Sequence, residues 1–244
     1  MTGRTVPRYV GRPGWGYRIL SLAIWAVNYA VVSVIALGIR RVRIEGRRNI
    51  RQFVRTGGVM VSNHCGYYDP AYVAWAIAPR RTWFTTIPRN MNLPLVGWVI
   101  KYLGAFAIPV RNGYDQLSAC FKRIQEQKGI IHFFPEVYML LQNQRLQRFH
   151  RGPFRLAWDH EASVLPITLV WLPGRLIPAW KRLRLVASPP LRARDFRDDD
   201  ELRGKVRDIM QGVIVDQRRR SAVEPIDPPF DPRDWYDRTR ANHV

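Results

Sequence analysis

The segment best equipped for chemistry contains Asn63, His64, Asp69 and Pro70 and follows a short apolar run. The imidazole of His64 and the carboxylate of Asp69 are five residues apart, which is about 140° on a continuous helix, so only a turn can bring them together. If they meet, Asp69 accepts a hydrogen bond from one ring nitrogen. The other nitrogen is then free to take a proton from a substrate hydroxyl. The alternative is that Asp69 only caps the following helix.

A strand and a helix must position this pair. Residues 58–62 are predicted to form a buried strand. Asp69 followed by Pro70 is typical of the N-cap and first position of a helix, here continuing through residues 71–78. His64 therefore falls in the turn between strand and helix.

The rest of the chain after residue 40 has the pattern of an α/β domain. We predict a single mixed sheet of about seven strands flanked by helices, the strands being residues 42–45, 58–62, 82–86, 105–110, 130–134, 164–171 and 183–187. Residues 115–128 are predicted to be a helix with Cys120 on its buried face. A second helix begins near residue 200, and its apolar side consists of Leu202, Val206, Ile209, Met210 and Val213. The chain thus divides into an anchoring segment (1–40), a catalytic domain (41–216) and a Pro-rich charged tail (217–244) that we expect to be extended or disordered.

Residues 19–39 carry no charged side chain, and at about 1.5 Å per residue they are long enough to cross a bilayer as a helix. Arginines flank the stretch on both sides, at Arg18 and Arg40, so the positive-inside rule gives no orientation. A membrane span therefore competes with an in-plane anchor or a helical hairpin. The third alternative is a helix buried in the core of the domain.

The net charge of +20 is carried mainly by arginine, since only five of the 39 basic residues are lysines. Three kinds of anionic partner fit this charge: nucleic acid, an anionic membrane surface or a phosphate-bearing substrate. The apolar N-terminal stretch favours the membrane surface, and no nucleic-acid recognition motif is present. The two cysteines, Cys65 and Cys120, indicate neither a disulfide framework nor a zinc site, so we expect an intracellular protein without a metal ion or cofactor.

Polar residues follow three of the predicted strands: His64, Arg111 and Glu136. Ligands in open α/β sheets collect beyond the carboxyl ends of the strands, so these residues are expected to share one cleft. A base, carboxylates and arginines in one cleft fit acyl transfer to a hydroxyl beside a phosphate. The alternatives are that Glu136 is a solvated loop acid and that Arg111 belongs to the general basic surface.

Four blocks in this order resemble the glycerolipid acyltransferases, the 1-acylglycerol-3-phosphate acyltransferases and their relatives. The first family block, N-H-x4-D-P, is matched by residues 63–70. The second resembles residues 94–98 and 104–111, the third is matched only in Phe134-Pro135-Glu136, and the fourth resembles residues 164–167. The resemblance runs from about residue 46 to residue 216.

The resemblance implies direct acyl transfer with His64 as general base, oriented by Asp69. The donor would be acyl-CoA or acyl carrier protein, and the acceptor a lysolipid such as a lysophosphatidic acid, whose phosphate Glu136 and Arg111 would surround. Backbone amides near the base are candidates for binding the oxyanion. Such an enzyme of phospholipid biosynthesis would lie at the cytoplasmic membrane, with its catalytic domain on the cytoplasmic face and in contact with anionic lipid.

The third block departs from the family pattern, because Val137-Tyr138-Met139 replaces Gly-Thr-Arg. Either a downstream arginine compensates, or the acceptor carries a head group other than glycerophosphate; the downstream arginines are Arg145, Arg148 and Arg151. A relative that binds membrane lipid without catalysis is a further alternative, and a nucleic-acid binder is motivated by charge alone. Cys65 as a nucleophile is disfavoured, since neighbouring side chains in an extended turn diverge. The apolar stretches 91–103 and 171–180 line an acyl channel or rest on the membrane, and the alternative is that they are ordinary core and loop.

Overall fold

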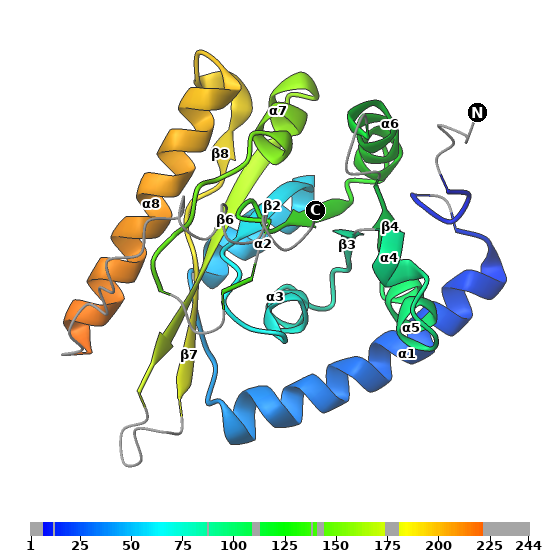
Figure 1. Ribbon diagram of the computed structural model, residues 1–244, viewed down its shortest axis with the longest axis horizontal. Coiled ribbons are helices and arrows are strands. Elements are labelled where there is room, and N and C mark those ends of the chain that lie inside the picture. The colour runs from blue at the N-terminus through cyan, green and yellow to red at the C-terminus, as the bar shows by residue number, and fades with distance from the viewer. Residues whose placement is uncertain are drawn as a thin grey trace, which may run out of the picture.

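The computed structural model describes residues 7–11, 13–86, 88–108, 113–137, 139–140, 144–173 and 181–221. They form an α/β fold around one eight-stranded mixed sheet with the order β1-β7-β6-β2-β5-β3-β4, and β8 pairs with β6 (Figure 1). The strands are β1 (Arg43–Glu45), β2 (Gly58–Ser62), β3 (Thr82–Thr86), β4 (Ala105–Ala107), β5 (Ile130–Phe133), β6 (Ser163–Leu172), β7 (Arg182–Ala187) and β8 (Leu191–Arg192). Only the pairings of β6 with β7 and with β8 are antiparallel.

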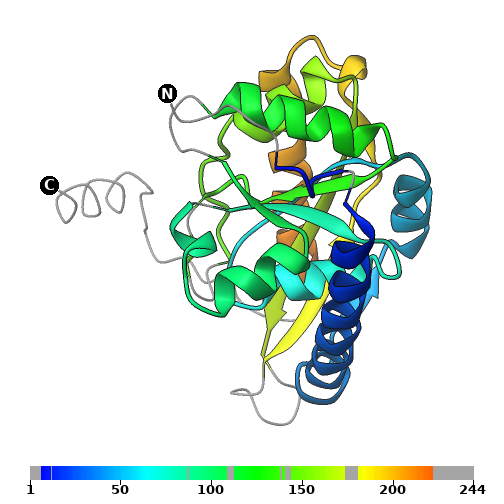
Figure 2. The same cartoon turned by 90° about the vertical axis from the view of Figure 1, so that its right-hand side faces the viewer.

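Helices cover both faces of this sheet (Figures 1 and 2). They are α1 (Trp15–Val34), which continues as a π-helical turn η1 (Ile35–Ile39), α2 (Arg47–Thr56), α3 (Asp69–Ala76), α4 (Pro88–Met91), α5 (Val96–Tyr102), α6 (Tyr114–Gln125), α7 (Gly152–Asp159), the 3₁₀ turn η2 (Ala193–Asp195) and α8 (Asp199–Arg220). One core cluster joins the sheet to α6, α7 and α8. The other joins it to α2, α3 and the end of the N-terminal helix.

The central strand β2 explains why the core divides in this way. Side chains alternate between the two faces of a strand, so a strand covered on both faces must be apolar throughout. Val59 and Val61 belong to the cluster with α6–α8, whereas Met60 belongs to the cluster with α2 and α3. All five residues of β2 are buried.

The predicted elements are present, with some shifts in their boundaries. All seven predicted strands are found, and β8 is an additional two-residue strand that was not predicted. Of the stretch 105–110, the structure describes a strand over Ala105–Ala107, and residues 109 and 110 lie outside the described residues. Cys120 is buried in the core, as predicted. Helix α8 runs to Arg220, so the prediction that the chain becomes extended after Asp216 is wrong for residues 217–220.

The apolar N-terminal stretch forms one continuous helix, α1 with η1, that is largely exposed. Among its residues only Ser21, Val32 and Ala36 are buried, so the alternative of a helix inside the core is wrong. The helix lies along one edge of the molecule beside α5 and α3 (Figure 1). Its length and composition suffice to cross a membrane.

Candidate active site

His64 and Asp69 meet in the turn that follows β2. The Nδ1 atom of His64 lies 3.1 Å from Oδ2 of Asp69. The same oxygen accepts hydrogen bonds from the backbone N–H groups of Cys65 and Gly66, each at 2.7 Å. The N-cap residue of α3 is Tyr68, so the prediction that Asp69 caps this helix is wrong. Asp69 instead turns back from the first turn of α3 and closes the loop around His64.

The side chain of Asn63, the residue before His64, is bonded to the neighbouring strand β6. Its side-chain amide donates to the carbonyl of Leu169 at 3.0 Å and accepts from the N–H of Leu169 at 2.8 Å. The last paired residues of β2 and β6 are Ser62 and Ile167. Beyond them, the side chain of Asn63 replaces the backbone in bonding to β6. This contact places His64 at a defined point beyond the sheet edge.

Glu136 holds the His64 backbone from the other side. Strands β2 and β5 are parallel neighbours, so their ends lie at the same edge of the sheet. Oε2 of Glu136 accepts from the N–H of His64 at 3.0 Å, and Oε1 accepts from the N–H of Gln147 at 3.0 Å. Burial raises the pKa of Glu136 to about 7, although both hydrogen bonds act in the opposite direction. The alternative of a solvated loop acid is therefore wrong, and the predicted meeting of Glu136 with His64 is found.

The ring of His64 is stacked but not sealed off. It lies on the ring of Phe134 with 3.9 Å between centroids, and 18 % of the side chain is exposed. Within the described part of the chain, no hydrogen bond to its Nε2 atom is found, whereas Nδ1 faces Asp69. This is the arrangement expected of a general base with one nitrogen oriented and the other free.

A second histidine, His132 on β5, was not singled out from the sequence. Its Nε2 atom lies 2.8 Å from the hydroxyl of Ser62, and its ring packs edge-on against Phe134. Burial lowers its pKa to about 3, so this ring is neutral. The only sequence signal is a polar residue inside the apolar run 130–134.

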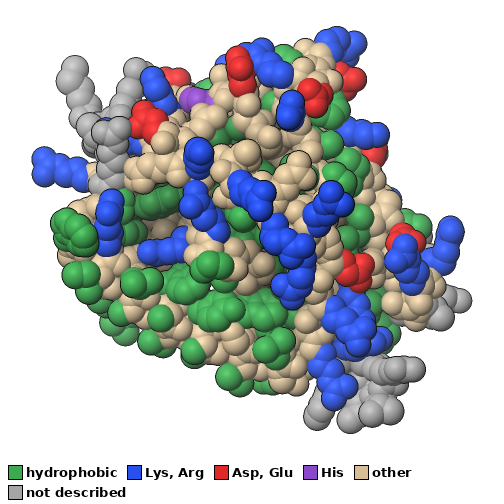
Figure 3. All heavy atoms as spheres, turned by 180° about the vertical axis from the view of Figure 1, so that it is seen from behind, with side chains coloured by type: hydrophobic (Ala, Val, Ile, Leu, Met, Phe, Trp, Pro, Cys, Tyr) green, Lys and Arg blue, Asp and Glu red, His purple; other side chains and the backbone are tan. Residues whose placement is uncertain are grey.

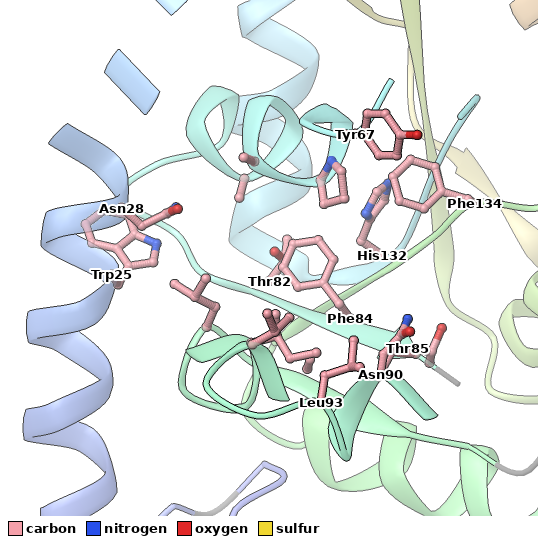
Figure 4. A pocket seen from close by; sticks show the side chains of 18 residues that line it. Trp25, Asn28, Tyr67, Thr82, Phe84, Thr85, Asn90, Leu93, His132 and Phe134 are labelled. Carbon is pink, nitrogen blue, oxygen red and sulfur yellow. The ribbon is translucent and has the colours of Figure 1, made fainter. Parts of the chain in front are cut away.

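An apolar pocket of about 780 Å³ reaches Phe134, the ring on which His64 stacks. Its walls come from β3 and β5, α3, α5 and the N-terminal helix. Figure 4 shows Tyr67 and Phe134 at one end, with Trp25 and Asn28 of α1 at the other. Because Phe134 lies between the pocket and His64, the imidazole of His64 is one ring away from a space suited to an alkyl chain. From the stretch 91–103, the pocket is lined by Leu93, Val96, Ile100 and Leu103.

The second apolar stretch, 171–180, is largely outside the described residues. Trp171 is described, and its ring packs edge-on against Tyr72 and beneath the guanidinium of Arg40. It is not among the residues that line the pocket.

The predicted phosphate-binding arginines have different surroundings. Arg111 lies outside the described residues. Arg145 and Arg148 are exposed. They lie within two residues of Gln147, whose backbone N–H donates to Glu136. Arg151 is bonded to Asp199 of α8 through two guanidinium nitrogens, which argues against the predicted compensation by this residue.

The backbone amides next to the base are already used. The N–H of His64 donates to Glu136, and the N–H groups of Cys65 and Gly66 donate to Asp69. These three amides therefore cannot also bind an oxyanion in this arrangement, contrary to the prediction for amides near the base. Cys65 is buried, and burial raises the pKa of its thiol well above the ordinary value, so a thiolate nucleophile is disfavoured.

Val137, at the position of the glycine in the family's third block, has a left-handed backbone conformation. Its φ angle is 65°, in the left-handed region that favours glycine and is costly for a β-branched residue. Glycine at this position would adopt the same conformation without strain. No group of three or more metal-binding side chains is found among the residues described.

Comparisons with known proteins identify the family and the fold. A model of the Acyltransferase family matches residues 41–170, which include His64, Asp69 and Glu136. The chain is similar to the chloroplastic 1-acyl-sn-glycerol-3-phosphate acyltransferase LPAT1 of Arabidopsis thaliana, with 29 % identity over 141 residues, or 57 % of this chain. The match spans only 38 % of that relative. The fold is similar to the crystal structure of the 1-acyl-sn-glycerophosphate acyltransferase PlsC from Thermotoga maritima, with a TM-score of 0.57 and 18 % identity, covering 83 % of this chain and 98 % of that one.

Proposed function

Because this chain belongs to the acyltransferase family, we propose that it moves a fatty acyl group from an acyl thioester to a hydroxyl of a lysophospholipid. The observation that carries the proposal is the contact of His64 with Asp69 beside an apolar pocket. The resemblance inferred from the four sequence blocks is confirmed at the level of the family.

In the proposed reaction, Nε2 of His64 takes the proton of the acceptor hydroxyl as its oxygen attacks the thioester carbonyl. Asp69 orients the ring through Nδ1 and stabilises the imidazolium that forms. The tetrahedral intermediate then expels the thiolate, which takes the proton from His64. General base catalysis contributes about 10²–10⁴-fold, and alignment of the two substrates supplies a further share.

The pocket and the names of the relatives support the proposed substrates. The pocket accepts an alkyl chain, because its walls are mainly Leu, Val, Ala and aromatic side chains. Arabidopsis LPAT1 is named for 1-acyl-sn-glycerol-3-phosphate, and we extend this acceptor class to the chain as a proposal. Acyl-CoA and acyl carrier protein are both suitable donors, and Arg145 and Arg148 are suited to an acceptor phosphate.

Membrane attachment completes the proposal. The exposed apolar helix formed by α1 and η1 would lie in the lipid, with one side forming the end of the pocket at Trp25. A lysolipid could then enter from the bilayer without crossing water. The proposed location is the cytoplasmic face of the cytoplasmic membrane.

The experiment is an assay of a labelled acyl thioester with a panel of lysolipids in neutral detergent. We expect His64→Ala to lower kcat by about 10²–10⁴-fold and Asp69→Asn by about 10²-fold or more, with unchanged circular dichroism. His160→Ala is the matched control, because this histidine bonds Ser118 away from the site. Normal turnover by the His64 variant would reject the proposed base.

A lipid-binding protein without catalysis is the second candidate function. The observation that favours it is the altered block at Val137, where the family's Gly-Thr-Arg is missing. It predicts that the chain binds lysolipids but transfers no acyl group to any member of the panel.

A further inference from the structure

Helix α2 carries a cluster of arginines on its exposed face. Arg47, Arg48, Arg51 and Arg55 are all exposed, and the helix contains no acidic residue. Arg48, Arg51 and Arg55 are three and four residues apart, so they project from the same side of the helix. With Gln52 they surround a hollow of about 400 Å³ on the surface.

Nothing in the described part of the chain neutralises this cluster. None of the four arginines has an ion pair with a described carboxylate. The acidic residue nearest in sequence, Glu45, accepts a hydrogen bond from Gln217 of α8. Like charges on successive turns of a helix repel one another, so the arrangement is unfavourable for the isolated chain and favourable only beside an anion.

The cluster lies on the same side of the sheet as the exposed apolar helix. Ile50 and Phe53 of α2 pack into the core cluster that also contains Val32 and Ala36 of the N-terminal helix. Figure 3 views this side and shows Lys and Arg side chains gathered next to a band of exposed hydrophobic side chains. Only the short strand β1 and its flanking residues separate η1 from α2 in the chain.

We infer that α2 is the surface that binds the anionic head groups of the bilayer in which the N-terminal helix lies. The inference rests on the proposed attachment of that helix to the membrane. A bilayer satisfies both features at once, since acyl chains cover the apolar helix while lipid phosphates accept bidentate hydrogen bonds from the arginines. A water-soluble acidic partner, such as an acyl carrier protein, would neutralise the arginines but leave the apolar band in water.

The head-group contact gives the enzyme a fixed orientation on the bilayer. A helix in the lipid defines one line of contact, and arginines to one side of it prevent rotation about that line. The end of the pocket lined by Trp25 and Asn28 then stays directed at the lipid. Each arginine at an anionic surface contributes about fivefold in affinity.

The test is vesicle flotation of the full chain with phosphatidylcholine alone and with about one third phosphatidylglycerol. We compare the wild type with the triple variant Arg48→Gln, Arg51→Gln, Arg55→Gln. The matched control is Lys122→Gln, Arg123→Gln, Lys205→Gln, which removes the same charge from α6 and α8 on the other side of the sheet. We expect the α2 variant to bind anionic vesicles at least about tenfold more weakly and to lose salt sensitivity, while binding to neutral vesicles is kept.

Equal weakening by the control, or no weakening by the α2 variant, would overturn the inference. So would a variant that floats normally but is impaired only with acyl carrier protein as donor, because α2 would then be the carrier's docking surface. Turnover in neutral detergent is measured in parallel. If the wild type transfers no acyl group in neutral detergent, the proposed function is refuted. The flotation result would still decide whether α2 binds head groups.

Discussion

His64, the proposed base, is held from three directions. Asp69 fixes one ring nitrogen, Phe134 supports the ring face, and Glu136 binds the backbone N–H. In the proposed reaction, a side chain fixed in this way needs little rearrangement when the acceptor hydroxyl arrives, which is how positioning contributes to catalysis. The backbone N–H groups of residues 64–66 are already hydrogen-bonded, so the proposed reaction requires other groups to stabilise the oxyanion.

Glu136 makes the stability of the fold dependent on pH. Burial raises its pKa from the ordinary 4.5 to about 7 in the folded chain. The folded chain therefore keeps this proton after the unfolded chain has lost it, so the contribution is full below about pH 4.5 and is lost as pH rises through 7. We expect the unfolding free energy of the wild type, relative to Glu136→Gln, to fall by about 1–3 kcal/mol between pH 5 and pH 8.

Urea unfolding at several pH values measures this difference. Glu161→Gln, at an exposed carboxylate paired with Arg194, is the control for removal of a surface charge. A difference between the wild type and Glu136→Gln that stays constant from pH 5 to pH 8 would contradict the raised pKa of Glu136.

Val137 adopts a strained backbone conformation that glycine would relieve. We expect Val137→Gly to raise the unfolding free energy by about 0.5–1 kcal/mol, because the relief of left-handed strain exceeds the added entropy of the unfolded chain. Val215→Gly, at an equally exposed valine inside α8, should instead lower stability by about 1 kcal/mol. Thermal unfolding of both variants gives the comparison, and destabilisation at residue 137 would contradict the argument.

At this scale the sequence predicted some roles and missed others. The contact of His64 with Asp69 was one of two alternatives that the sequence offered, because the turn between strand and helix could bring the two side chains together. The bonds of Glu136 were not predictable, because both of its partners are backbone amides from distant segments and amides leave no signature in side-chain type. His132 was missed for a related reason, since one histidine in an apolar run does not reveal what lies across the sheet.

At the scale of elements, α1 has two roles in one helix. Most of its surface is exposed and apolar, and its inner side contributes Trp25 and Asn28 to the end of the pocket. The same helix that would enter the lipid therefore sets the length of the space available to an acyl chain.

Trp25→Ala should lengthen this space. We expect the variant to shift its preferred acyl chain by about two or more carbons, because the indole at the end of the pocket is replaced by a methyl group. Trp15→Ala is the control, since Trp15 lies on the same helix, is 79 % exposed and does not line the pocket. Competition between acyl thioesters of different length measures the preference, and an identical profile in both variants would show that Trp25 does not limit the chain.

Elements with a strong local pattern were predictable from the sequence. The boundaries of β2 and β3 agree with prediction, because apolar and β-branched runs bounded by turn residues identify buried strands. Strand β8 and the turn η1 were missed, since two residues give no period and a π-helical turn has the same composition as the helix that it continues. The exposure of α1 could not be derived from periodicity either, because a helix that is apolar all round suits a core and a membrane equally.

At the scale of the whole molecule, the two sides of the sheet differ in character. The side with α6, α7 and α8 carries a closed core. The side with α2 and α3 carries the pocket, the exposed N-terminal helix and the arginine cluster. Everything proposed to contact lipid thus lies on one side, which is what attachment parallel to a bilayer requires.

The predicted boundary at residue 40 suggests that the anchor and the catalytic domain are separable. The contacts of the N-terminal helix indicate instead that it is part of the fold. Val32 and Ala36 are buried in the domain core, Tyr17 donates to the carbonyl of Lys101 at 2.6 Å, and Trp75 donates to Ser33 at 2.9 Å. We expect removal of residues 1–40 to lower the melting temperature in neutral detergent by about 5–10 °C, since the loss of a few kcal/mol shifts a domain of this size by that amount. Removal of residues 222–244, predicted from sequence to be an extended tail, is the control. Truncation of the N-terminal segment without a change in melting temperature would show that the helix is a detachable anchor, and that the pocket keeps its shape without it.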